Sequence, residues 1–361
     1  MIRRHLAVLL AGEFLLAPVA PVTAQNTVRL ISAPDKAQGN QVHPQLLVEF
    51  GGAYKGLQAT FVERGGKRVA VQSGLSNAGS DFTVTLLDSQ VENALATERG
   101  YIYVTRQQLA LMTSEVELAS VMGHQVDHVA ARHAASRNTR ATIGGLLARG
   151  VSLAAKSHLS TRIAGPGAQL YTVKYGRHQE YQAAALGVRS ILAVSYSPHA
   201  SADILAALDG STGLMAQASG SAWSAPIWAS THPNGADRLQ RAAALATATG
   251  GPELAIAQNT AFLRMLDGLP YADGKEGRKV LRIVTAGAKD AIGTLSQRMA
   301  VAASNRQRFV IVNGLPADEP VKPGTLVKLL VATQPRIRQS AKLRPWMTCN
   351  TWACQGRCPR M

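Results

Sequence analysis

Two histidines one helical turn apart are the residues of this chain whose spacing best suits metal binding. His124 and His128 lie in the segment SEVELASVMGHQVDHVAARH, residues 114–133, whose apolar residues recur every three or four positions. This period predicts a helix with one buried face. Imidazoles four residues apart on one helix face could bind a single zinc ion. Chance alone gives roughly 0.2 such pairs in a chain with this histidine content, so the pair needs support from other residues.

The residue after the first histidine bears on the chemistry of such a site. Zinc that activates water needs three protein ligands, an open position and a nearby general base. In zinc peptidases with this histidine spacing, the base is a glutamate directly after the first histidine. This chain has Gln125 there. An amide cannot accept the proton, and general-base catalysis contributes about 10²- to 10⁴-fold, so the sequence predicts weak or absent hydrolysis.

The elements before this helix predict an α+β domain. Residues 82–89 and 101–105 alternate between polar and apolar side chains, which indicates two strands that lead into the helix through a short helical piece. Residues 57–73 are interpreted as a helix followed by a strand. Ser114 and Glu117 predict a capping box at the start of the helix, in which each side chain bonds the backbone N–H of the other residue.

Further helices are predicted beyond residue 133. Residues 139–167 resemble a helical hairpin over the site, and residues 169–188 form a helical pattern that ends at Gly187. Pro198 opens another helix, which we expect to run through Leu208. Residues 225–234 then form a loop, and helices resume at Ala236.

The last part of the chain predicts a small unit and a tail. After a linker at 272–278, the pattern is a strand at 282–285, helices at 292–299 and 305–312, and a strand at 326–331, which is a βααβ order. The tail, residues 332–361, lacks periodicity and is predicted to be disordered. It carries Lys and Arg without Asp or Glu, and all three cysteines of the chain.

Several motifs in order resemble one peptidase family. The run DSQVENALATERGYIYVTRQQLALMTSEVELASVMGHQVDHVAARH is similar to the HtpX and BepA type of zinc metallopeptidases, family 48, which also includes the CAAX prenyl proteases. RHQEYQAAALGV resembles the family's E-x-x-A-D segment, so the resemblance makes Glu180 the third zinc ligand beside His124 and His128. STHPNGADRLQRA resembles the loop whose histidine, here His232, approaches the metal. The implied fold is mainly helical and zincin-like, with a small strand pair.

The chain departs from this family at residues that matter for catalysis. Besides Gln125, Ala184 replaces an aspartate that supports the site, and loss of such a group costs roughly 10- to 100-fold in metal affinity or activity. Asp127 replaces a small residue and is expected to add negative charge near the metal face. Residues 93–100 differ from the family's N-A-F-A-x-P-G-G, which alters the strand edge that would pair with a peptide substrate.

The other histidines have less support. His133 is interpreted as a packing or surface histidine, and His178 is expected to face solvent. His232 is left open between a loop cap and a residue that acts at the metal. His43 has no supporting context.

The βααβ unit, residues 282–331, resembles a LysM module. Asn313, Gly314, Leu315, Pro323 and Gly324 match that pattern. The resemblance implies binding of peptidoglycan, whereas a structural cap without a ligand is the alternative. Lys289 and Ala291 depart from the usual G-D-T turn beside the sugar groove.

Composition narrows the setting of the protein. Residues 1–24 carry a basic start, an apolar run and a small-residue cleavage site, which is typical of a signal peptide, although Glu13 interrupts the run. We therefore expect an exported protein, in the bacterial periplasm, with no membrane span in the mature chain. The formal net charge is +16, but the basic residues are scattered, so no nucleic-acid partner is predicted.

Two hypotheses follow for residues 25–275, interpreted as the metallopeptidase-like domain. The first is a zinc metalloendopeptidase of envelope protein quality control, with protein or peptide substrates and one zinc ion on His124, His128 and Glu180. The second is a pseudopeptidase that binds client proteins or peptidoglycan without cutting. Gln125 and Ala184 favour the second, and the intact ligand positions favour the first.

Overall fold

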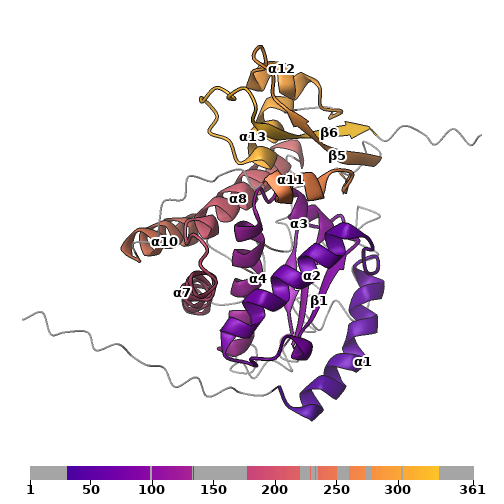
Figure 1. The fold of residues 1–361 in the computed structure, drawn as a ribbon, viewed down its shortest axis with the longest axis vertical. Helices are drawn as coiled ribbons and strands as arrows, with labels where there is room; N and C mark the ends of the chain where they lie inside the picture. The colour runs from indigo at the N-terminus through magenta and orange to yellow at the C-terminus, as the bar shows by residue number, and fades with distance from the viewer. Residues whose placement is uncertain are drawn as a thin grey trace, which may run out of the picture.

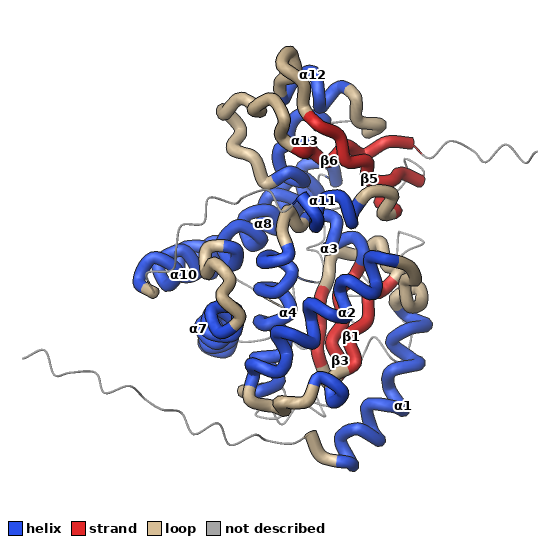
Figure 2. Tube along the Cα trace, viewed as in Figure 1, coloured by secondary structure: helices blue, strands red, loops and turns tan. Residues whose placement is uncertain are grey.

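The computed structural model describes residues 31–97, 100–131, 133, 177–219, 228, 232, 235–249, 260–272, 278–301 and 304–332. The described part of the chain is mainly helical with two small three-stranded sheets, so the α+β prediction is confirmed at this level. Figures 1 and 2 show the helices of the larger part around the first sheet, and the second sheet at the opposite end from α1. The predicted signal peptide, the hairpin at 139–167 and the tail from residue 333 lie outside the described residues.

The first sheet contains the two predicted strands and a third one. β1 (Thr83–Leu87) pairs in parallel with β3 (Tyr101–Thr105), and β2 (Ala94–Ala96) pairs antiparallel with the other side of β3. The order β1-β3-β2 places β2 at the edge. All five residues of β3 are buried, as expected for a central strand with both faces covered.

A glycine lets one helix pack closely on this sheet. α2 (Leu57–Ala70) lies against β1, and Gly66 allows the contact because a Cβ there would come within 2.7 Å of Val84. The strand predicted at the end of residues 57–73 is wrong, because a 3-10 turn, η1 (Val71–Ser73), follows α2 and stops at Gly74 with φ 75°.

The segment before α2 is helical, which the sequence pattern did not indicate. α1 (Ala33–Glu49) contains Pro44 within the helix, although proline normally breaks or kinks a helix. Leu46 and Phe50 pack with Tyr101 and Tyr103 of β3, so tertiary burial overrides the poor helical pattern.

α4 (Glu115–Ala130) is the predicted central helix, and it follows the short α3 (Arg106–Leu111). The Ser114 Oγ accepts from the Glu117 backbone N–H at 3.2 Å, so half of the predicted capping box is confirmed. The other half is wrong, because the Glu117 carboxylate accepts from the Thr113 backbone N–H and the Thr113 hydroxyl instead of from Ser114. Glu117 thus binds one residue further back than predicted.

Three long helices face α4 from the other side: α7 (Arg177–Ala193), α8 (Ala200–Ser219) and α10 (Gly235–Ala248). α7 packs directly on α4 and extends past Gly187, so the predicted helix end at Gly187 is wrong. Gly187 has a packing role instead, since a Cβ there would lie 3.3 Å from the His124 backbone nitrogen. The close approach of the two backbones brings residues of α7 to the histidines of α4.

The last described part of the chain has the predicted βααβ order. α11 (Thr260–Leu266) and β4 (Pro270–Ala272) lead into β5 (Arg278–Thr285), α12 (Ile292–Gln297), α13 (Asn305–Asn313) and β6 (Leu326–Ala332). β5 begins at Arg278 rather than at residue 282, because it pairs with both β4 and β6. One hydrophobic core runs from Met122 of α4 to Phe309 of α13.

A buried lysine joins this last unit to the start of α4. Lys328 of β6 is 0% exposed, and its Nζ donates to the backbone carbonyls of Ala110, Leu111 and Met112 at 2.8–3.1 Å. These carbonyls lie at the end of α3, where helical carbonyls lack partners within the helix. Within the described residues, no helix combines the length and apolar character needed to cross a bilayer.

Candidate metal centre

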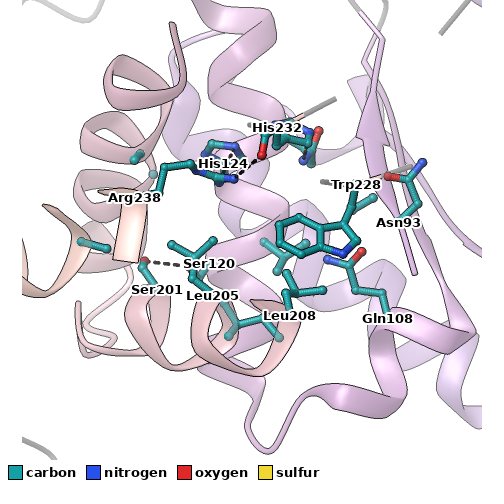
Figure 3. A pocket seen from close by; sticks show the side chains of 17 residues that line it. Asn93, Gln108, Ser120, His124, Ser201, Leu205, Leu208, Trp228, His232 and Arg238 are labelled. Atoms are coloured by element: carbon teal, nitrogen blue, oxygen red, sulfur yellow. Dashed lines mark hydrogen bonds between the residues drawn. The ribbon is translucent and has the colours of Figure 1, made fainter. Parts of the chain in front are cut away.

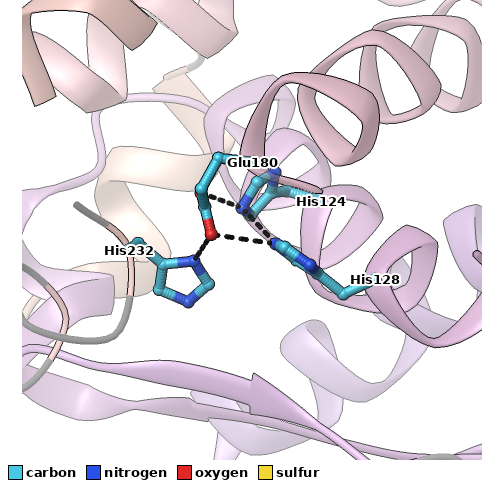
Figure 4. Close-up of side chains that lie close together, drawn as sticks. All are labelled: His124, His128, Glu180 and His232. Carbon is cyan, nitrogen blue, oxygen red and sulfur yellow. Dashed lines mark hydrogen bonds and ion pairs between the residues drawn. The ribbon is translucent and has the colours of Figure 1, made fainter. Parts of the chain in front are cut away.

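Four buried or nearly buried side chains converge where α4 and α7 cross. His124 and His128 come from α4, Glu180 from the first turn of α7, and His232 from the segment before α10. Their ligand atoms all lie within 4.8 Å of one another. Figure 4 shows the Glu180 carboxylate between the three imidazole rings. The structure thus brings the three predicted ligands and the fourth candidate, His232, to one point.

The spacing of these atoms suits a tetrahedral metal ion. The His128 Nε2 lies 3.1 Å from the His124 Nε2 and 3.4 Å from Glu180 Oε1, and the His124 Nε2 lies 3.5 Å from Glu180 Oε2. Ligands about 2.0–2.2 Å from a tetrahedral zinc are separated by about 3.3 Å. Glu180 Oε2 is also buried without a hydrogen bond from any described residue. The donor set of two nitrogens and a carboxylate therefore fits zinc.

The pKa values of the cluster favour ligands that are ready for a cation. Burial lowers the pKa of His124 to about 4 and the pKa of His128 well below 6.5, so both rings are neutral near pH 7. Burial alone would raise the pKa of Glu180, but the electrostatic effect of the neighbouring imidazoles, first of all that of His232, holds it far below its usual range. Neutral imidazoles and an ionised carboxylate are the forms that bind zinc.

Gln125 contacts His232 beside this cluster. The Gln125 Nε2 lies 3.4 Å from the His232 Nε2, and the His232 Nδ1 lies 2.8 Å from Glu180 Oε1. An amide nitrogen only donates, so in this arrangement the His232 Nε2 accepts from Gln125. The His232 Nδ1 then carries the proton and donates to Glu180. His232 therefore lies at the cluster itself, next to Glu180.

Arg238 of α10 is a member of the site that sequence reasoning missed. Its Nε forms an ion pair with Glu180 Oε2 at 3.2 Å, and its Nη2 lies 3.3 Å from the His124 Nε2. The side chain is 5% exposed, and burial lowers its pKa. The motif STHPNGADRLQRA contained this residue, but a distant arginine gives no sign of its partner from spacing alone.

His133 is a buried packing histidine, one of its two predicted alternatives. Its ring is 3% exposed and contacts the outer nitrogen of His128, with the two Nδ1 atoms 2.9 Å apart. The prediction for His178 is confirmed, because that residue is exposed. His43 packs on β3, where its Nδ1 lies 2.9 Å from the Tyr103 hydroxyl.

Asp127 contacts α7, and its predicted charge near the metal face stays a prediction. Its side chain is 2% exposed and accepts from the Ser190 hydroxyl of α7 at 3.2 Å. Burial raises the pKa of Asp127 to about 7. The periodicity of α4 could place Asp127 near the histidines but could not tell which side α7 would cover.

An elongated cavity starts at the cluster. His124, Gln125 and His232 line one end, and Figure 3 shows Trp228 and the side chains of α8 along its walls. Its volume is about 50 Å³ for the centres of water molecules, which is space for a few waters or one side chain. Ala184 lines this cavity, where the resemblance led us to expect an aspartate. The edge strand β2 contributes Ala94 to the lining, so a segment bound at this edge would reach the cavity.

Comparison with known proteins agrees with this geometry. The chain is 26% identical over 183 residues to the mitochondrial metalloendopeptidase OMA1 of Schizosaccharomyces pombe, an overlap of 50% of this chain and 51% of that protein. It thus spans about half the length of this curated relative. Residues 57–246, which are 190 of the 361 residues, match the model of peptidase family M48. With its converging histidines and glutamate, the chain belongs to peptidase family M48, a family of zinc metallopeptidases.

Proposed function

We propose that this protein binds one zinc ion in a metalloendopeptidase-type site and hydrolyses peptides weakly or not at all. One observation carries the proposal: the ligand set is intact, but Gln125 stands in the position of the general base. The relative OMA1 is named a metalloendopeptidase, and this name supports the proposal that the substrates of this chain are proteins or peptides.

His124, His128 and Glu180 would hold the zinc, which when bound supplies a Lewis acid that polarises a carbonyl. Gln125 can orient a water or a carbonyl by hydrogen bonding, but it cannot take up a proton. Its amide already donates toward His232, which in this arrangement uses its other nitrogen toward Glu180. No described residue next to Gln125 is thus placed as a free proton acceptor in the way a glutamate would be.

Arg238 adds a fixed positive charge to the site. Its guanidinium lies within ion-pair distance of Glu180 and so offsets part of the charge that a metal would neutralise. We infer that Arg238 holds Glu180 in place when the metal is absent. The ion pair between Arg238 and Glu180 also supplies a positive partner for the buried carboxylate in the metal-free site.

A second function, binding without cleavage, is favoured by the cavity. The cavity reaches the cluster past Leu205 and Leu208, so a client segment could place one side chain there whether or not it is cut. Such a pseudopeptidase would bind unfolded or envelope proteins as clients.

Casein hydrolysis by the purified protein tests the proposal. Gln125→Glu restores a carboxylate in the base position and is expected to raise the rate by about 10²- to 10⁴-fold over the native chain. Gln72→Glu, the same change at an exposed residue, is the control and is expected to have no effect. Native protein that cleaves as fast as Gln125→Glu would contradict weak hydrolysis, and pure protein without zinc would contradict the metal site.

For the C-terminal unit, we propose peptidoglycan binding by a LysM-like module at residues 282–331. The βααβ order supports it, and the alternative is a structural cap. Because Lys328 ties this unit to α3, the test uses the full chain. Co-sedimentation of the native protein with insoluble peptidoglycan is expected. A full-length protein that stays in the supernatant contradicts this proposal.

We also propose that the protein is exported to a bacterial periplasm and serves protein quality control in the envelope. The basic and apolar pattern of residues 1–24 supports export. Fractionation with amino-terminal sequencing tests it, since mature protein is expected to begin near Gln25. Purified periplasmic protein that still begins at Met1 would contradict a cleaved signal.

A further inference from the structure

A chain of three side chains runs from α7 to the outer nitrogen of His128. The Gln182 Oε1 lies 3.0 Å from the His133 Nε2, and the His133 Nδ1 lies 2.9 Å from the His128 Nδ1. The remaining nitrogen of His128, Nε2, points toward His124 and Glu180. Both imidazoles are nearly fully buried, at 1% and 3% exposure.

The contact between the two Nδ1 atoms needs one proton. At hydrogen-bond distance, one of these two outer nitrogens must donate and the other must accept, whereas the Nε2 atoms of His124 and His128, 3.1 Å apart, have the spacing of two metal ligands. If His128 donates, its proton is on Nδ1 and its Nε2 keeps a lone pair for a metal. If His133 donates, the proton of His128 is on Nε2, and that nitrogen cannot bind a metal.

Gln182 decides between these two arrangements. Its side-chain oxygen only accepts, so the His133 Nε2 must carry the proton and donate to it. The His133 Nδ1 is then an acceptor, which leaves the His128 Nδ1 as the donor. His128 therefore donates to His133, and His133 donates to Gln182 of α7. With its proton on Nδ1, His128 keeps a lone pair on Nε2 for a metal.

A second glutamine of α7 holds the backbone of His133. The Gln179 Nε2 donates to the His133 carbonyl oxygen at 3.0 Å, whereas Gln182 contacts the ring. One helix thus fixes both the backbone position and the ring of His133 just beyond the end of α4. Gln179 therefore holds the segment in place, whereas Gln182 sets the tautomer of the His133 ring.

We propose that Gln182 and His133 are positioning residues that set the tautomer and orientation of His128 for zinc. Groups that orient a ligand in this way typically contribute 10- to 100-fold in metal affinity. The inference rests on the metal site and not on hydrolysis, so it holds for an active and for an inactive enzyme.

Zinc affinity of the full-length protein, measured by competition with a chromophoric chelator, tests this inference. Gln182→Leu removes the accepting oxygen and is expected to weaken zinc binding about 10- to 100-fold. Gln182→Glu keeps an acceptor in the same place and is expected to retain native affinity. Gln72→Leu, the same change at an exposed glutamine of η1, is the matched control and is also expected to retain native affinity.

Imidazole ¹⁵N NMR of the zinc-loaded protein gives an independent readout. We expect a proton on the Nε2 of His133 and none on its Nδ1, together with a proton on the Nδ1 of His128. Thermal unfolding of each metal-free variant shows whether a loss of affinity comes from the fold. His133→Phe, which cannot accept, is expected to weaken zinc binding at least as much as Gln182→Leu.

Three results would overturn the inference. These are equal zinc affinity of Gln182→Leu and Gln72→Leu, a proton on the Nδ1 of His133, and a native protein that binds no zinc. Failure of the proposed function has a different signature, because casein hydrolysis by native protein leaves the order of these zinc affinities unchanged.

Discussion

Ionisable side chains are buried near both ends of helix α4, but the two ends differ in whether the protein itself supplies partners for them. At the amino end, Glu117 and Lys328 are surrounded by partners from the protein itself. At the carboxyl half, His124, His128 and Glu180 direct their ligand atoms at one another across 3.1–3.5 Å. The first arrangement is complete without a ligand, whereas the second has the spacing of a metal site.

Burial has a different consequence for each end. Burial raises the pKa of Glu117 and lowers the pKa of Lys328, while the charge of each partner opposes the shift. In the metal cluster, burial lowers the pKa of both histidines, but Glu180 stays ionised because the imidazoles stabilise its charge. Burial of ionisable groups is thus common to both ends of α4. What distinguishes the metal cluster is that its ligand atoms converge on one point.

The largest expected effect comes from the amino end. Lys328→Met leaves three buried carbonyls without their donor and removes the nearby positive charge that stabilises the ionised form of Glu117, so we expect a loss of about 3–5 kcal/mol in the free energy of unfolding near pH 7. Urea denaturation measures it, and Lys322→Met, an exposed lysine of the same unit, is the control.

The double variant Lys328→Met with Glu117→Gln is expected to recover part of this loss, because both charges are then gone. Zinc bound per folded molecule should stay unchanged in all these variants. If Lys328→Met alone stays within about 0.5 kcal/mol of native protein, the amino end is not the completed charge pair described above.

The metal end is expected to be sensitive to acid when metal is removed. The pKa of His124 falls from 6.5 in the unfolded chain to about 4 in the fold, so the unfolded state binds more protons between these values. The contribution of His124 to stability is full above pH 6.5 and is lost as pH falls to 4, by an amount on the order of 3 kcal/mol.

Chemical denaturation of chelator-treated protein at several pH values measures this slope. His124→Asn should flatten the profile in that window, whereas the exposed His178→Asn should not. Equal slopes of native protein and His124→Asn between pH 6.5 and 4 would show that His124 is not held neutral by the fold.

Removing the Glu180 carboxylate tests the metal end of α4 directly, through its affinity for zinc. Glu180→Gln replaces an anionic ligand with a neutral amide, so zinc affinity should fall by more than about 100-fold, the upper range for groups outside the ligand set. Glu63→Gln, at a half-exposed carboxylate, is the control in the same chelator competition. Equal affinities would exclude Glu180 as a ligand.

The smallest effect is expected where α4 and α7 approach most closely. Gly187→Ala places a methyl group 3.3 Å from the His124 backbone nitrogen, which costs about 1–3 kcal/mol, while the gain in helix propensity returns about 0.5–1 kcal/mol. Thermal unfolding should therefore show a net loss of about 1 kcal/mol. Gly213→Ala in α8, where a Cβ meets nothing within 4 Å, should be slightly stabilising.

The sequence predicted the local features of the site and missed those that depend on tertiary contacts. The spacing of His124 and His128 and the cap at Ser114 are properties of one helix, so periodicity finds them. Family motifs added Glu180 and His232, which the structure places beside the histidines. Whether the four act as ligands stays a prediction.

The missed features have partners far away in the chain. α1 tolerates Pro44 because Leu46 packs on β3, and Gly187 is a packing residue because α4 lies against it. Arg238 meets His124 across 114 residues, and Lys328 meets Met112 across 216. Single-sequence patterns carry no information on such pairs, since nothing near either residue reports the other.

The contact of Lys328 has a consequence for the order in which the chain is made. The carbonyls it binds precede α4 by only a few residues, yet Lys328 follows them by more than 200. A ribosome must therefore release β6 before the amino end of α4 acquires its last partner. The metal-binding helix is completed late in synthesis, so a nascent chain that has already presented His124, His128, Glu180 and His232 still lacks its finished support.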